Sequence, residues 1–124
     1  MTRPNVAAEK PLFWMGSALK EVMRFPPEVQ RSIGFALSAA QYGGKHPSAK
    51  PWKGEGPGVL EVVKDYDGDT YRAIYTVRFA HAVYVLHTFQ KKSPRGIETR
   101  QSDIHLVRER LRLAQQDYGE RYAC

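Results

Sequence analysis

The stretch "VLEVVKDYDGDTYRAIYTVRFAHAVYVLHTF", residues 59–89, decides the fold of this chain. Its first segment, 59–66, is rich in valine and predicts a strand. Asp67-Gly68 follows and is a typical two-residue hairpin turn. The segment 70–78 then alternates, which places two sets of side chains on opposite faces of a second strand. One set is Tyr71, Ala73, Tyr75 and Val77, and the other is Arg72, Ile74, Thr76 and Arg78.

A third strand, 82–89, follows the turn "FAH" and ends in a basic run. It is apolar on both faces, which is typical of a central strand. Pairing of the second and third strands places Arg72 opposite a residue near 86–88, so Arg72, His87 and Lys91 come within reach of one another. The face to which each points depends on a register that is open at this level.

Helices are predicted before and after these strands. Residues 11–14, "PLFW", predict a short strand, and Ser17 is placed to cap a first helix that ends at Pro26. A second helix is predicted over 27–42, because its apolar residues repeat with helical spacing up to Gly43-Gly44. A loop is predicted over 43–58, and a last helix begins near Thr99 or Ser102, with the apolar stripe Ile104, Val107, Leu111 and Ala114.

This order of elements predicts an α+β domain. Two N-terminal helices are expected to pack on one face of a small antiparallel meander that is followed by a C-terminal helix, leaving the other face partly open. We expect residues 1–11 to be a flexible lead, 12–118 a single domain, and 119–124 a tail.

The chain is basic, with a formal net charge of +6 over 124 residues. This excess favours a polyanionic partner such as RNA, DNA or an acidic protein. The single cysteine, Cys124, cannot form an intrachain disulfide, which is compatible with a reducing cytoplasm. No apolar run approaches the length of a membrane span, and no signal-peptide core is recognised, so no membrane association is expected.

A cluster of arginine, lysine and histidine suits phosphate chemistry. Arginine binds phosphate in bidentate fashion, lysine adds positive charge where negative charge develops, and histidine transfers protons near neutral pH. These groups suffice for RNA cleavage, in which the 2′-OH is the nucleophile. Each residue also has a structural interpretation: Arg72 as the cross-strand partner of Glu61, His87 as a core histidine, and Lys91 and Lys92 as charges that protect a strand end.

Other chemistries lack their motifs. No glycine-rich phosphate loop follows a strand, no G-x-S-x-G is present, and the four histidines have no metal-ligand spacing. No cofactor or metal is therefore expected.

Five segments together resemble the RelE/ParE superfamily of toxins, in particular its HigB-like, phage-derived host-inhibition branch. They are "FPPEVQRSIGFALSAAQYGG", "LEVV", "TYRAIYTV", "VLHTFQKKS" and the arginine-rich last helix. The resemblance covers about residues 12–114. It implies a metal-independent endoribonuclease that cuts mRNA, often on the ribosome, and a helix-turn-helix antitoxin as partner.

The resemblance also implies roles for individual residues. Arg72 corresponds to the arginine of the "YR" motif that contacts the scissile phosphate, and Lys91 and Lys92 correspond to the basic run that stabilises the transition state. The tyrosine that follows this run in RelE is missing here, so His87 and Glu61 are the candidates for the general base. Other basic residues are expected to hold RNA by charge: Lys45, Lys50, Lys53, Arg95, Arg108 and Arg112.

Three alternatives stay open at this level. ParE-type members of the superfamily inhibit DNA gyrase and are not nucleases. A plain nucleic-acid-binding module and an inactive prophage-derived protein that still binds an antitoxin are also compatible with the residues. Base preference, ribosome dependence and oligomeric state are not determined by the sequence.

Overall fold

The computed structural model describes residues 8–91 and 101–123. Their elements follow in the order β1 (Leu12–Trp14), α1 (Ala18–Val22), α2 (Pro27–Gln41), β2 (Ala49–Pro51), β3 (Val59–Tyr66), β4 (Asp69–Thr76), β5 (Val83–Lys91) and α3 (Gln101–Arg121). The predicted α+β class is confirmed, with N-terminal helices, a mostly antiparallel sheet and a C-terminal helix. α3 continues past the predicted domain boundary at 118. Within the described ranges, no helix is long and apolar enough to cross a membrane.

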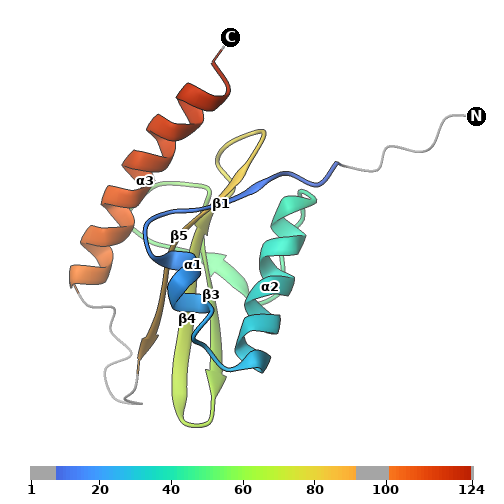
Figure 1. The fold of residues 1–124 in the computed structure, drawn as a ribbon, viewed down its shortest axis with the longest axis vertical. Helices are drawn as coiled ribbons and strands as arrows, with labels where there is room; N and C mark the ends of the chain where they lie inside the picture. Colours follow the sequence, from blue (N-terminus) through green and yellow to red (C-terminus); the bar gives the residue numbers. More distant parts are fainter. Residues whose placement is uncertain (1–7, 92–100, 124) are drawn as a thin grey trace, which may run out of the picture.

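The sheet has five strands in the order β1-β5-β4-β3-β2 (Figure 1). Its centre is the predicted antiparallel meander of β3, β4 and β5. Two short strands, β1 and β2, extend the meander at its two edges. β1 pairs in parallel with β5, and β2, which lies inside the predicted loop 43–58, pairs antiparallel with β3. The second of these pairings brings Lys50 beside Glu61.

The turn between β3 and β4 has the predicted two-residue form. Asp67 and Gly68 have φ angles of 50° and 84°, so both lie in the left-handed region that the favoured hairpin turn requires. Glycine adopts this conformation without steric cost, and aspartate is one of the few other residues that tolerate it. The turn sets the register in which Tyr66 pairs with Asp69 and Glu61 with Ile74.

The helices cover opposite faces of the sheet. Figure 1 shows α1 and α2 on one side and α3 on the other. The predicted alternation along β4 is confirmed, because Tyr71, Ala73 and Tyr75 belong to the core beneath α1 and α2, whereas Ile74 belongs to the core beneath α3. α3 packs on this second face through Val107, Leu111 and Ala114, so the face expected to be partly open is covered along the helix.

A β-bulge in β5 decides which side chains reach the α3 face. His87 pairs with Ile74 and Val85 pairs with Tyr75, so Leu86 has no residue opposite it. An extra residue of this kind shifts the alternation of all residues that follow it. His87 and Phe89 therefore lie opposite Ile74 and Arg72 on the α3 face. The sequence predicts a partner for Arg72 near 86–88, and the observed partner is one residue further along, Phe89.

Candidate functional site

Arg72 and Glu61 form a buried ion pair on the α3 face of the sheet. Nη1 of Arg72 donates to Oε2 of Glu61 at 2.9 Å, and the two side chains are only 7% and 11% exposed. Glu61 lies on β3 and Arg72 on the adjacent strand β4, so the pair is the cross-strand contact that the structural interpretation of Arg72 predicts. A buried arginine is stable only when its charge is paired, so Glu61 holds the Arg72 guanidinium in place.

A pocket of about 440 Å³ lies against this ion pair. Glu61 forms part of its wall, together with Lys50, Pro51, Trp52, Lys53 and Ile104. Lys50 Nζ lies 3.8 Å from Oε1 of Glu61, and the Lys50 side chain is 60% exposed. Two of the lysines that were predicted to bind RNA, Lys50 and Lys53, therefore line the same pocket as Glu61 of the buried ion pair.

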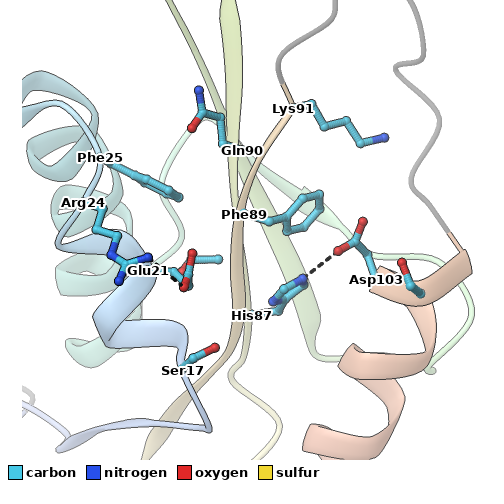
Figure 2. A pocket seen from close by; sticks show the side chains of 11 residues that line it. Ser17, Glu21, Arg24, Phe25, His87, Phe89, Gln90, Lys91 and Asp103 are labelled. Carbon is cyan, nitrogen blue, oxygen red and sulfur yellow. Dashed lines mark hydrogen bonds and ion pairs between the residues drawn. The ribbon is translucent and has the colours of Figure 1, made fainter.

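His87 lies under α3 and contacts Asp103 in its first turn. Nε2 of His87 is 2.8 Å from Oδ1 of Asp103 (Figure 2). Nδ1 of His87 is 3.5 Å from Nη1 of Arg110. Burial lowers the pKa of His87, while the hydrogen bond to Asp103 acts in the opposite direction. In the neutral ring, Nε2–H donates to Asp103 and Nδ1 faces the guanidinium of Arg110. Both nitrogens of His87 are thus engaged by side chains of α3.

We predict that stability falls in mild acid because of His87. Its folded pKa lies below the unfolded value of 6.5, so the unfolded chain binds more protons between the two values. The free energy of unfolding should therefore rise with pH. The contribution of His87 is fully present above about pH 6.5. Below that value the free energy of unfolding decreases, by at most about 1.4 kcal/mol per pH unit from this group. Urea unfolding between pH 7.5 and 5.5 measures the slope.

Two variants separate His87 from the other titrating groups. His87→Gln should flatten the slope, because glutamine does not titrate. His105→Gln changes an exposed histidine of α3 and should leave the slope unchanged. Equal slopes for the wild type and His87→Gln would contradict the assignment.

A second pocket, of about 490 Å³, lies beside His87 between α1 and α3. Figure 2 shows His87 and Phe89 on the side of β5 that faces α3, and Glu21, Arg24 and Phe25 on the other side. The pocket is lined by Ser17, Glu21, Arg24, Phe25, His87, Thr88, Phe89, Gln90, Lys91, Ser102 and Asp103. Lys91, predicted as a catalytic residue, thus shares one pocket with His87.

The other predicted basic residues lie in different surroundings. Arg108 and Arg112 of α3 are paired with carboxylates of the chain, at 3.1 Å from Glu55 and 2.7 Å from Glu109 respectively. Lys45 is exposed in the segment before β2. Lys92 and Arg95 lie outside the described residues. Lys50 and Lys53 are therefore the two predicted RNA-binding residues that line a pocket next to Arg72 and Glu61.

The sequence interpretation missed four residues of this region. They are Phe89, Asp103 and Arg110, which contact His87, and Trp52, which lines the pocket of the ion pair. Asp103 alone had a local signal, since an acidic residue in the first turn of a helix is favoured there. That signal explains its position in the helix but does not indicate a contact with β5.

A family model matches residues 20–112, about three quarters of the chain, and describes a phage derived protein Gp49-like (DUF891). The match includes every element from most of α1 to the middle of α3. No curated protein sequence matches the chain closely enough to count as a relative.

Solved structures of bacterial toxins are similar in fold. A mutant of the E. coli toxin RelE with two arginines replaced by alanine, in the free state, aligns with a TM-score of 0.59 at 16% identity, over 84% of this chain and 99% of that one. The isolated E. coli RelE toxin aligns with a TM-score of 0.52 at 19% identity, over 81% and 97%. The toxin–antitoxin complex RelBE2 of Mycobacterium tuberculosis aligns with a TM-score of 0.42 at 18% identity, over 68% of this chain and 94% of that one. This likeness adds nothing to the fold assignment.

Proposed function

The chain belongs to the Gp49-like family of phage-derived proteins and has the fold of the RelE toxin, and from this premise we propose that it is a toxin that cleaves mRNA. The predicted resemblance to the RelE/ParE superfamily and its phage-derived branch is confirmed. The nuclease activity is the proposal. The proposed partner of the protein is the antitoxin of a type II toxin–antitoxin pair.

The observation that carries the proposal is that four residues suited to phosphate chemistry lie on the same face of the sheet. Arg72 pairs with Phe89 and Thr70 pairs with Lys91, and alternate residues of a strand share a face. His87 lies opposite Ile74, which is also opposite Glu61 on β3. Arg72, Glu61, His87 and Lys91 thus come from three adjacent strands and lie on one face, beneath the first turns of α3.

These groups match the needs of RNA cleavage by an internal nucleophile. The 2′-oxygen attacks the adjacent phosphorus, the bond from phosphorus to the 5′-oxygen breaks, and a 2′,3′-cyclic phosphate and a 5′-OH result. A base must take the proton of the 2′-OH, and water supplies a proton to the leaving 5′-oxygen. Negative charge increases on the phosphate oxygens in the transition state, where fixed cations stabilise it.

We assign the phosphate to Arg72 and the proton of the 2′-OH to Glu61. An arginine has five N–H donors, enough to hold a carboxylate and a phosphate oxygen at the same time. The hydrogen bond between Arg72 and Glu61 would then place the base next to the bound phosphate. Lys50 and Lys53 in the adjoining pocket would hold the RNA backbone, and Lys91 would stabilise the developing charge.

His87 is the second candidate for the base, and its contacts favour a positioning role. Asp103 and Arg110 engage both of its ring nitrogens. To accept a proton from RNA, the ring would have to leave one of these partners. His87 would instead hold the first turns of α3 above Arg72 and Lys91.

Replacing Lys91 with alanine should slow mRNA cleavage about 100-fold, the usual effect of removing one group that stabilises a developing oxyanion. The purified protein would be incubated with programmed ribosomes, and new 5′ ends would be mapped by primer extension. Lys10→Ala is the matched control, because Lys10 lies next to the C-terminal end of α2, away from this face. Cleavage by Lys91→Ala at the rate of the control would remove Lys91 from the mechanism.

The proposed partner is a helix-turn-helix antitoxin, which rests on the family resemblance. A short reading frame of that type next to the gene, whose product copurifies with the toxin and restores growth, would support this part of the proposal. Copurification without restored growth would contradict the antitoxin role.

One observation favours a second candidate, a toxin or binding module without nuclease activity. Glu61 already pairs with Arg72, and α3 engages both nitrogens of His87. A ParE-like toxin would stop growth through gyrase and leave mRNA intact. Mapping mRNA ends after induction distinguishes the two functions.

A further inference from the structure

The pocket between α1 and α3 contains an aromatic ring that the proposed reaction does not use. The ring of Phe89 lies parallel to that of His87, with 4.7 Å between the ring centroids and 18° between the planes. Phe89 is partly exposed in the pocket wall, and its backbone partner on β4 is Arg72. A stack of two flat rings therefore lies one strand away from the residue that is proposed to hold the scissile phosphate.

The charges of this pocket suit an uncharged group better than an anion. Among the residues that the structure describes, its lining includes two cations, Arg24 and Lys91, and two carboxylates, Glu21 and Asp103. Arg24 and Glu21 lie 3.9 Å apart. Since the signs are balanced among these described residues, together they repel a phosphate as much as they attract it. A nucleobase, which is flat, polar at its edge and uncharged, matches this lining.

Asp103 supplies an acceptor at the edge of the stack. Oδ1 is bonded to His87, and Figure 2 shows the second oxygen pointing away from His87, toward the side on which Lys91 lies. An ionised carboxylate only accepts hydrogen bonds. It therefore selects a base edge that donates, such as the exocyclic amine of adenine.

We propose that this pocket is a subsite for one nucleobase of single-stranded RNA, with Phe89 as the stacking surface and Asp103 as the acceptor for an exocyclic amine. The inference rests on the proposed function, because it assumes that RNA reaches Arg72. Single-stranded RNA is commonly held by a basic surface that follows the backbone and by aromatic rings that stack on bases. The pocket volume of about 490 Å³ lies in the range of sites that enclose small ligands.

The test measures binding separately from cleavage. The probe is a short RNA that carries 2-aminopurine, with 2′-deoxy sugars throughout its reactive positions so that it cannot be cut. Stacking quenches the fluorescence of 2-aminopurine. We expect quenching with the wild type, and a loss of affinity of roughly 5- to 100-fold for Phe89→Leu, the range for removing one base–aromatic stack.

Two further proteins and two competitor RNAs complete the experiment. Phe89→Tyr keeps the ring and should bind as the wild type does. Phe35→Leu changes a phenylalanine of α2 that is 65% exposed and should also have no effect. An unlabelled RNA with adenosine should compete better than one with purine riboside, which lacks only the amine. Equal competition would overturn the role of Asp103.

The outcomes separate this inference from the nuclease proposal. If the wild type cuts mRNA while Phe89→Leu binds the probe and quenches it like the wild type, the subsite is wrong and the nuclease stands. If quenching depends on Phe89 but no mRNA is cut, the subsite is supported and the nuclease is wrong. Absence of quenching with the wild type overturns the subsite, whatever the cleavage assay gives.

Discussion

Replacing Arg72 with alanine is expected to abolish mRNA cleavage and to lower the free energy of unfolding by about 3–5 kcal/mol. The stability effect arises because Glu61, whose side chain is 11% exposed, would lose the guanidinium at 2.9 Å that balances its charge. The exposed Lys50, at 3.8 Å, is a weaker partner. The effect on activity arises because the proposed contact to the scissile phosphate would be lost.

Urea unfolding measures the first effect. Induced expression measures the second, with growth and mRNA 5′ ends followed together. Because Arg72→Ala changes both properties, the variant Arg72→Met/Glu61→Leu is needed to separate them. Replacing both members of a buried ion pair with apolar residues of similar size is often neutral or stabilising. We expect this double variant to fold about as stably as the wild type and to leave mRNA intact.

Two results would contradict these expectations. A folded double variant that still generates new mRNA ends would exclude Arg72 and Glu61 from the reaction. A wild type that stops growth while mRNA stays intact would contradict the nuclease proposal and make gyrase the first target to test.

The second large effect is expected for Ile74→Ala, which should lower the free energy of unfolding by about 2–5 kcal/mol. Ile74 is fully buried and lies between Glu61 and His87 across the three central strands. It packs in the core beneath α3 with Tyr84, Leu86 and Val107. The loss would be a large part of the total stability of a small domain, which is about 5–15 kcal/mol.

Urea unfolding again gives the measurement, and Phe35→Ala is the control. Phe35 is large and apolar but 65% exposed, so its loss should change stability by no more than about 0.5 kcal/mol. Similar values for the two variants would mean that α3 does not close over Ile74 in the way described.

Local sequence patterns suffice to predict the central hairpin and the two long helices, α2 and α3. The period of two along β4 placed Arg72 and Ile74 on one face and Tyr71 and Tyr75 on the other, as the two cores show. Asp67-Gly68 specified the turn, and the start of α2 at Pro27 follows from the constraints of that residue. These features depend on neighbours a few residues apart, so local backbone preferences suffice to predict them.

Ser17 shows the limit of such local signals. It lies at the predicted N-cap of α1, yet its side chain caps no backbone N–H of that helix. Its Oγ instead accepts a hydrogen bond from Arg110 at 3.2 Å, a residue of α3 that is 93 positions away. A distant arginine thus replaced the local bond that the residue type predicted.

The tertiary structure decided how the candidate site is assembled. The bulge at Leu86 sets the face of His87 and Phe89, and a one-residue change of register would turn both away from α3. The contact of Asp103 with His87 depends on where α3 begins and how it crosses the sheet. Pattern and spacing describe each element separately, whereas these contacts depend on the positions of several elements relative to one another. Packing of the whole core sets those positions.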